Sequence, residues 1–157
     1  MKSPKVMTVA ALLGLALFTT EQPGLAESNC RQVKGQQAAI FDPVTNTSTG
    51  SITKGGLLNG TALEVFGTAV APTPDPTTVS FTADFTIATT HGELKASNVY
   101  ILDVITGLAA ILGRINPTTS TGTFAGATGV LYIAGKTISF DPVTVQGEVT
   151  AEICLAE

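Results

Sequence analysis

The sequence predicts an all-β fold, either a sandwich or a small closed antiparallel barrel of about eight or nine strands. In residues 79–89, VSFTADFTIAT, apolar and polar side chains alternate with the period of two that a half-buried strand requires. Turn sequences, rather than helices, separate the apolar stretches. Cys30 and Cys154 lie near the two ends of the chain. A bond between them would place the first and last strands side by side, as in a closed barrel.

Each predicted strand ends at residues that favour a turn. His91-Gly92 and Thr106-Gly107 are predicted hairpin tips, and residues 72–76, PTPDP, form a loop. Residues 108–112, LAAIL, would also suit a helix, which stays open as the alternative there. The predicted strands are residues 33–41, 50–54, 61–70, 79–89, 93–105, 108–115, 123–134, 136–140 and 143–155.

The first 26 residues have the pattern of a secretion signal. Lys2 and Lys5 precede an apolar run over residues 6–18, and Gly24 and Ala26 are small residues at the positions that a signal peptidase reads. The run is shorter than the roughly 20 residues that span a bilayer, which argues against the alternative of a retained anchor. We therefore predict a single mature domain over residues 27–157, secreted or periplasmic.

The charge of the chain excludes two classes of partner. It carries 8 basic and 12 acidic residues, a formal net charge of −4. Nucleic acids and anionic membrane surfaces both require a basic face, so neither is predicted as a partner. Aromatic residues are only 6% of the chain and Trp is absent, which argues against an outer-membrane barrel with its aromatic girdles.

Cys30 and Cys154 are the only cysteines. An even pair in an exported protein usually forms a disulfide, and we predict this bond. The alternative is two free thiols in a metal or catalytic site, but no histidine lies near either one in the sequence. The acidic residues in turns form no D-x-D-x-D-G loop, so calcium is not predicted, and we predict no metal and no cofactor.

The glycine-rich stretch at residues 120–129, STGTFAGATG, does not fit a phosphate-binding loop. Gly122 and Gly126 are too close for a P-loop and no Lys follows them, while a strand rather than a helix follows Gly129. Glycines inside a strand mark bulges or close packing. We therefore expect Phe124 to fill the core of a bent strand.

Two segments carry a resemblance to a known family. Residues 121–129, TGTFAGATG, and residues 81–103, FTADFTIATTHGELKASNVYILD, resemble the allene oxide cyclase and dirigent barrel superfamily. The chain is most similar to secreted bacterial proteins of this barrel type, which share a Cys near the mature start and an ending like residues 147–155, GEVTAEICL. The resemblance implies an eight-stranded antiparallel barrel whose lumen holds a small apolar molecule. Plant members form trimers or dimers, so a homo-oligomer is an open alternative.

The catalytic residues of the resembled cyclases are not found here. Those enzymes use an acidic and an amide residue on the first strand and a Cys deeper in the lumen. The first predicted strand of this chain offers Lys34, Gln36 and Gln37 but no carboxylate, and the two cysteines are predicted to be bonded to each other. The sequence is compatible both with an enzyme and with a protein that has no catalytic activity.

Four charged residues inside or beside apolar strands are candidate binding residues: Glu64, Asp84, Asp103 and Arg114. Most charged strand residues face water, but a carboxyl group inside a lumen would have a raised pKa and could act as an acid. Arg114 could pair with it or hold the carboxylate of a ligand. His91, the only histidine, lies beside a turn glycine with no predicted partner. The alternation does not say which strand face lines the lumen.

Three functions remain compatible with the sequence. The first is a secreted barrel that binds a small hydrophobic or amphipathic molecule in its lumen. The second is a cyclase- or dirigent-type enzyme that guides ring closure of a reactive intermediate. The third is a structural or interaction protein of the cell envelope with a filled barrel. A cavity of a few hundred Å³ would separate the first two from the third, and an acid or base lining that cavity would favour the enzyme.

Overall fold

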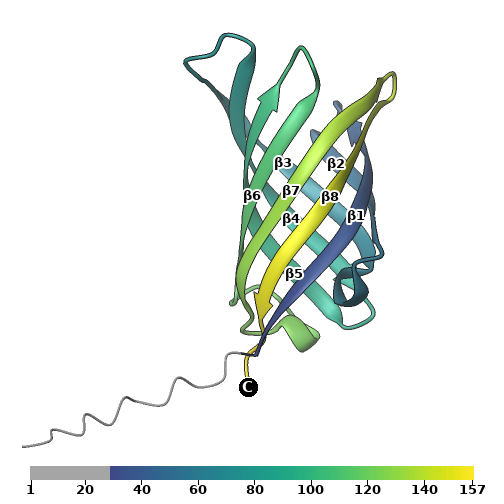
Figure 1. The fold of residues 1–157 in the computed structure, drawn as a ribbon, viewed down its shortest axis with the longest axis vertical. Helices are drawn as coiled ribbons and strands as arrows, with labels where there is room; N and C mark the ends of the chain where they lie inside the picture. Colours follow the sequence, from purple (N-terminus) through teal and green to yellow (C-terminus); the bar gives the residue numbers. More distant parts are fainter. Residues whose placement is uncertain (1–28) are drawn as a thin grey trace, which may run out of the picture.

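The computed structural model describes residues 29–157 and shows a closed eight-stranded antiparallel barrel (Figure 1). The predicted signal peptide lies outside the described residues. Among those residues, no helix has the length and apolar character needed to cross a membrane. The elements are β1 (Cys30–Asp42), β2 (Thr47–Thr53), the short 3-10 turn η1 (Gly56–Leu58), β3 (Gly60–Pro72), β4 (Thr78–Thr89), β5 (Gly92–Asp103), β6 (Leu108–Ile115), a second 3-10 turn η2 (Gly122–Phe124), β7 (Thr128–Phe140) and β8 (Val143–Cys154).

Each strand pairs with its neighbours in the sequence, and β1 pairs with β8 to close the barrel. At this seam Cys30 is directly opposite Cys154, and the two form a disulfide. The predicted barrel and the predicted bond are both confirmed. The alternative of two free thiols is wrong, because both sulfurs are used in the bond.

The alternation predicted for β4 is also confirmed, and the structure shows which face is inside. Ala83, Phe85 and Ile87 are buried in the lumen, whereas Thr82 and Asp84 are exposed on the outer face. The helix alternative at residues 108–112 is wrong, since these residues belong to β6, whose partners are β5 and β7.

One end of the barrel is closed by side chains. Leu58 of η1 and Phe124 of η2 are completely buried. Both turns lie at the lower end of the barrel in Figure 1. The four hairpin tips that join β1 to β2, β3 to β4, β5 to β6 and β7 to β8 lie together at the opposite end.

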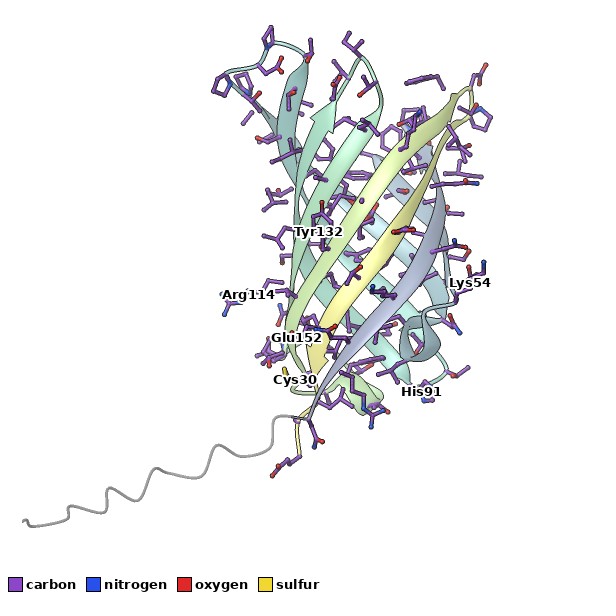
Figure 2. All side chains as sticks on the ribbon, viewed as in Figure 1. Cys30, Lys54, His91, Arg114, Tyr132 and Glu152 are labelled. Carbon is purple, nitrogen blue, oxygen red and sulfur yellow. A yellow bond between two sulfur atoms is a disulfide. The ribbon has the colours of Figure 1, made fainter. Side chains whose placement is uncertain are left out.

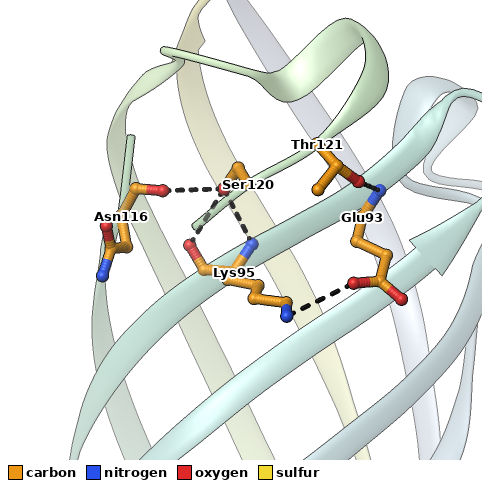
Figure 3. A network of polar contacts seen from close by, with 5 residues as sticks. All are labelled: Glu93, Lys95, Asn116, Ser120 and Thr121. Atoms are coloured by element: carbon orange, nitrogen blue, oxygen red, sulfur yellow. Dashed lines mark hydrogen bonds and ion pairs between the residues drawn. The ribbon is translucent and has the colours of Figure 1, made fainter. Parts of the chain in front are cut away.

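Polar contacts attach the loop between β6 and β7 to β5 at the closed end (Figure 3). The backbone N–H of Lys95 donates to Ser120 Oγ at 3.0 Å, and the N–H of Glu93 donates to Thr121 Oγ1 at 3.1 Å. Ser120 Oγ in turn donates to the carbonyl of Asn116 at 2.8 Å. These bonds hold the loop that carries Phe124 against the barrel wall.

The glycine-rich stretch differs from its prediction. Residues 120–127 form a loop with one 3-10 turn rather than a bent strand, and Gly122 and Gly126 in this loop have positive φ angles of 59° and 74°. The strand β7 begins only at Thr128, and Gly129 within it has a φ of 137°. Phe124 nevertheless fills the core as expected. The predicted strands at 123–134 and 136–140 are one strand, β7, which continues through Gly135.

Candidate functional site

A cavity of about 460 Å³ occupies the half of the lumen next to the hairpin tips. It reaches solvent there, because exposed tip residues such as Val104 and Phe140 belong to its lining. Gly135 and Gly147 have no side chain and Ala109 has only a methyl group, and this leaves the space open. The wall is otherwise mostly aliphatic and aromatic. A barrel filled by its own side chains would have no such space.

The floor of the cavity carries three polar side chains. Gln37, Glu64 and Tyr100 are the deepest lining residues of β1, β3 and β5, counted from the hairpin tips. Ile111 and Ile133 complete this level on β6 and β7. A polar group entering the lumen would therefore meet its partners at the bottom, below an apolar wall.

Glu64 is the acidic residue of this floor, and only 4% of its surface is exposed. It faces inward because its strand neighbours on the same face, Ala62 and Phe66, pack into the lumen. The Tyr100 hydroxyl donates a hydrogen bond to Glu64 Oε1. Burial raises the pKa of the Glu64 carboxyl above its usual value, and the side chains of Tyr100 and Gln37 offset only part of this effect.

Tyr100 stays protonated and acts as a donor. Burial, followed by the nearby charge of Glu64, raises the pKa of the Tyr100 hydroxyl far above its ordinary value. The pair can therefore hold one proton on Tyr100 and a second on Glu64, or release the second.

Four aromatic rings line the cavity beside Glu64. The Phe66 ring packs edge-on against Phe41, Phe81 and Tyr100, with centroids 5.5, 5.7 and 5.5 Å apart. Phe81 and Tyr100 are stacked with centroids 4.7 Å apart. Phe81 and Tyr100 face each other because their Cα atoms are paired across β4 and β5.

No basic side chain of the described residues enters the lumen. Every Lys, Arg and His between residues 29 and 157 is at least partly exposed, and Lys54, His91 and Arg114 lie on the outside in Figure 2. The single ion pair in this part of the chain joins Lys95 to Glu93, at 3.4 Å and near the surface. Glu64 therefore has no cationic partner there.

A buried amide lies next to this floor. Asn98, 1% exposed, precedes Tyr100 by two residues on the inner face of β5. Neither atom of its amide has a hydrogen-bond partner among the described residues. Gly113 on β6 is the residue paired with it, and any Cβ at that position would overlap Asn98 Oδ1. The glycine thus makes room for the amide.

The four candidate residues do not form one cluster. Glu64 lies in the lumen, while Asp84 and Arg114 are exposed on the outer wall of β4 and β6, with Ser97 of β5 between them. Arg114 is therefore on the opposite side of the wall from Glu64. Asp103 is at the β5–β6 tip, where Oδ1 accepts hydrogen bonds from the N–H groups of Ile105 and Thr106.

Of the residues at or beside the floor, the sequence predicts only Glu64 as a site residue. Gln37 is one of several polar residues of a first strand without a carboxylate, and no motif selects Tyr100, Phe66 or Asn98. The signal that could have found Asn98 and Tyr100 is the alternation of β5, which puts both on the same face as Leu94 and Ala96.

Comparison of the chain with protein-family profiles, curated sequences and solved structures finds no match.

Proposed function

We propose that this protein binds a small hydrophobic or amphipathic molecule in the lumen of its barrel. The observation that carries the proposal is the cavity of about 460 Å³, which is open at the hairpin tips and mostly apolar. Its volume lies in the range typical of small-molecule sites, roughly 300–1,000 Å³. The disulfide is compatible with an exported carrier, in line with the predicted signal peptide.

The proposal is tested by filling the cavity. Ala109 lines it on β6, whereas the next residue, Ala110, is exposed on the outer face of the same strand. We expect wild-type protein and Ala110→Phe to bind the neutral dye Nile red, and Ala109→Phe to bind it at least about tenfold more weakly. Native mass spectrometry of gently purified protein would show any retained compound. Equal dye binding by all three proteins, or none by wild type, would contradict the proposal.

A ring-closing enzyme is the second candidate, and the Glu64–Tyr100 pair favours it. A carboxyl with a raised pKa, beside a hydroxyl and inside an apolar lumen, can transfer a proton to or from a bound intermediate. The test generates a quinone methide in the presence of the protein and measures the enantiomeric excess of the cyclised product. An excess that is lost in Glu64→Gln supports the enzyme. A racemic product with wild-type protein rules out this reaction.

A further inference from the structure

Glu64 is a buried acid without a protein counter-ion in the described residues. A buried carboxylate is stable only when it is paired, and otherwise it takes up a proton. The polar side chains that face it are Tyr100 from β5, Gln37 from β1 and, at the paired position on β2, Ser48. Its paired residue on β4 is the apolar Phe85. None of these carries a positive charge. The floor can therefore accept a cation but offers no positive charge to an anion.

The aromatic rings add a second feature that suits a cation. Phe41, Phe66, Phe81 and Tyr100 all line the cavity on the side of Glu64. The face of an aromatic ring carries negative electrostatic potential and attracts ammonium groups within about 6 Å, most strongly where water is excluded. A purely apolar ligand would need only aliphatic walls, such as those that β6 and β7 provide.

The mouth of the cavity is acidic. Each of the four hairpin tips around it carries one aspartate, and no tip contains Lys, Arg or His; these residues are Asp42, Asp75, Asp103 and Asp141. Backbone N–H groups lower the pKa of Asp42 and Asp103, so both stay ionised in mildly acidic solution. Lys136 is on the outer face of β7 below the tips, opposite Leu108. Such a rim concentrates cations at the entrance.

We propose that the lumen is selective for an organic cation, an amphipathic amine or quaternary ammonium whose charged head contacts Glu64 and the aromatic rings while its apolar tail extends toward the mouth. This inference rests on the proposed binding function and names the class of ligand. Carboxylates and phosphates are disfavoured, because the floor offers them no positive charge and, where Glu64 is ionised, they would place a second negative charge beside it.

Binding of such a cation is coupled to a proton. The ligand stabilises the carboxylate form of Glu64, so the fraction of Glu64 that is protonated in the free protein releases its proton to solvent. Affinity for the cation therefore rises with pH through the raised pKa of Glu64 and then levels off. A neutral ligand would not show this rise.

The experiment compares four probes that share one tail: octyltrimethylammonium, octylammonium, 1-octanol and octanoate. Calorimetric titration of the full mature protein measures the affinity of each, in two buffers with different heats of ionisation. We expect both ammonium probes to bind at least about tenfold more tightly than octanol, with octanoate weakest. The heat of ammonium binding should depend on the buffer, which reports the released proton.

Two variants and one control isolate the groups responsible. Glu64→Gln keeps the shape and a polar side chain, and we expect it to lower ammonium affinity by about tenfold or more and leave octanol affinity within about threefold. Phe66→Leu removes one ring and should weaken ammonium binding selectively, by several fold. Asp84→Asn, on the outer wall, removes the same charge as Glu64→Gln and should change neither affinity.

The outcomes separate this inference from the proposed function. If octanol or octanoate binds as tightly as the ammonium probes, or if Glu64→Gln keeps the preference, selectivity for cations is wrong and the binding function stands. If no probe binds and Nile red does not either, both proposals fail together.

Discussion

Glu64 and Asp84 are acidic residues on adjacent strands, yet the barrel wall separates them. Asp84 is paired with Val65 and shares its outward direction, whereas Glu64, one residue earlier on β3, points inward. A shift of one residue along a strand reverses the side on which a side chain lies. The strand face on which an acidic residue lies therefore decides its role: Asp84 is a surface charge, and Glu64 is a buried acid.

Stability should depend on pH through Glu64. Its pKa is raised in the folded state above the ordinary 4.5, so the folded protein binds the proton more tightly than the unfolded chain. The stabilisation from Glu64 is complete below pH 4.5. It is lost as the pH rises through the folded-state pKa of Glu64, by at most about 1.4 kcal/mol per pH unit. Urea unfolding across this window should show the loss in wild-type protein but not in Glu64→Gln.

Glu152→Gln, on the outer face of β8, is the matched control for this measurement and should keep the wild-type dependence. If wild-type protein and Glu64→Gln lose stability in parallel as pH rises, Glu64 does not titrate as its burial implies.

Sequence alone could give Glu64 as one of four candidates, but could not select it. The alternation of β4 separates Phe85 from Asp84 without saying which of them is inside, since both faces of a small barrel can be covered. Tyr100 and Asn98 gave no signal by type, because a single Tyr or Asn in a strand is common on either face. Their roles depend on neighbours from β3 and β6 that only the closed barrel brings close.

At the scale of elements, the predicted strands were largely confirmed because period-two alternation and turn residues are local signals. The predicted strand at residues 108–115 has the same bounds as β6, Leu108–Ile115. The prediction for the segment around Gly122 was wrong because its structure depends on contacts that are not local. Glycine is compatible with a bulged strand and with a loop, and the choice depends on contacts with β5 and β8, which lie far away in sequence.

Two glycines of this segment should respond differently to substitution. Gly129 has φ of 137°, and a Cβ there would overlap the carbonyl oxygen of Glu152 on β8. We expect Gly129→Ala to lower the free energy of unfolding by about 2–4 kcal/mol. Gly126 has φ of 74° and its nearest contact would be the Ala156 methyl at 3.0 Å, so Gly126→Ala should cost only about 1–2 kcal/mol. Urea unfolding measures both, and equal losses would show that the contact with β8 is not limiting.

At the scale of the whole molecule, the sequence predicted a closed barrel but not a hollow one. Closure followed from the positions of Cys30 and Cys154. Hollowness depends on the sum of side-chain volumes at each level of the lumen. Leu58 and Phe124 fill the closed end, whereas Gly135 and Gly147 leave the other end open. Which side chains share a level depends on the register of all eight strands, and no local sequence pattern specifies that register.

The Cys30–Cys154 bond should contribute substantially to global stability. It joins positions 124 residues apart and so restricts the conformations of the unfolded chain. Removal of a native disulfide typically lowers the free energy of unfolding by about 2–5 kcal/mol. The double variant Cys30→Ser/Cys154→Ser should unfold at correspondingly lower urea. A reductant should shift wild-type protein to the same midpoint and leave the double variant unchanged. An unshifted midpoint in the double variant would show that the seam between β1 and β8 holds without the bond.

The strand order also determines how the barrel can fold. Seven of the eight pairings join strands that are consecutive in the chain, so hairpins can form locally and early. The pairing of β1 with β8 alone requires a loop that contains the rest of the domain. Until that last pairing forms, the sheet is open and the inner face, Glu64 included, remains in water. We therefore expect the lumen to form in a late step, and the open sheet to be prone to aggregation until the seam between β1 and β8 is complete.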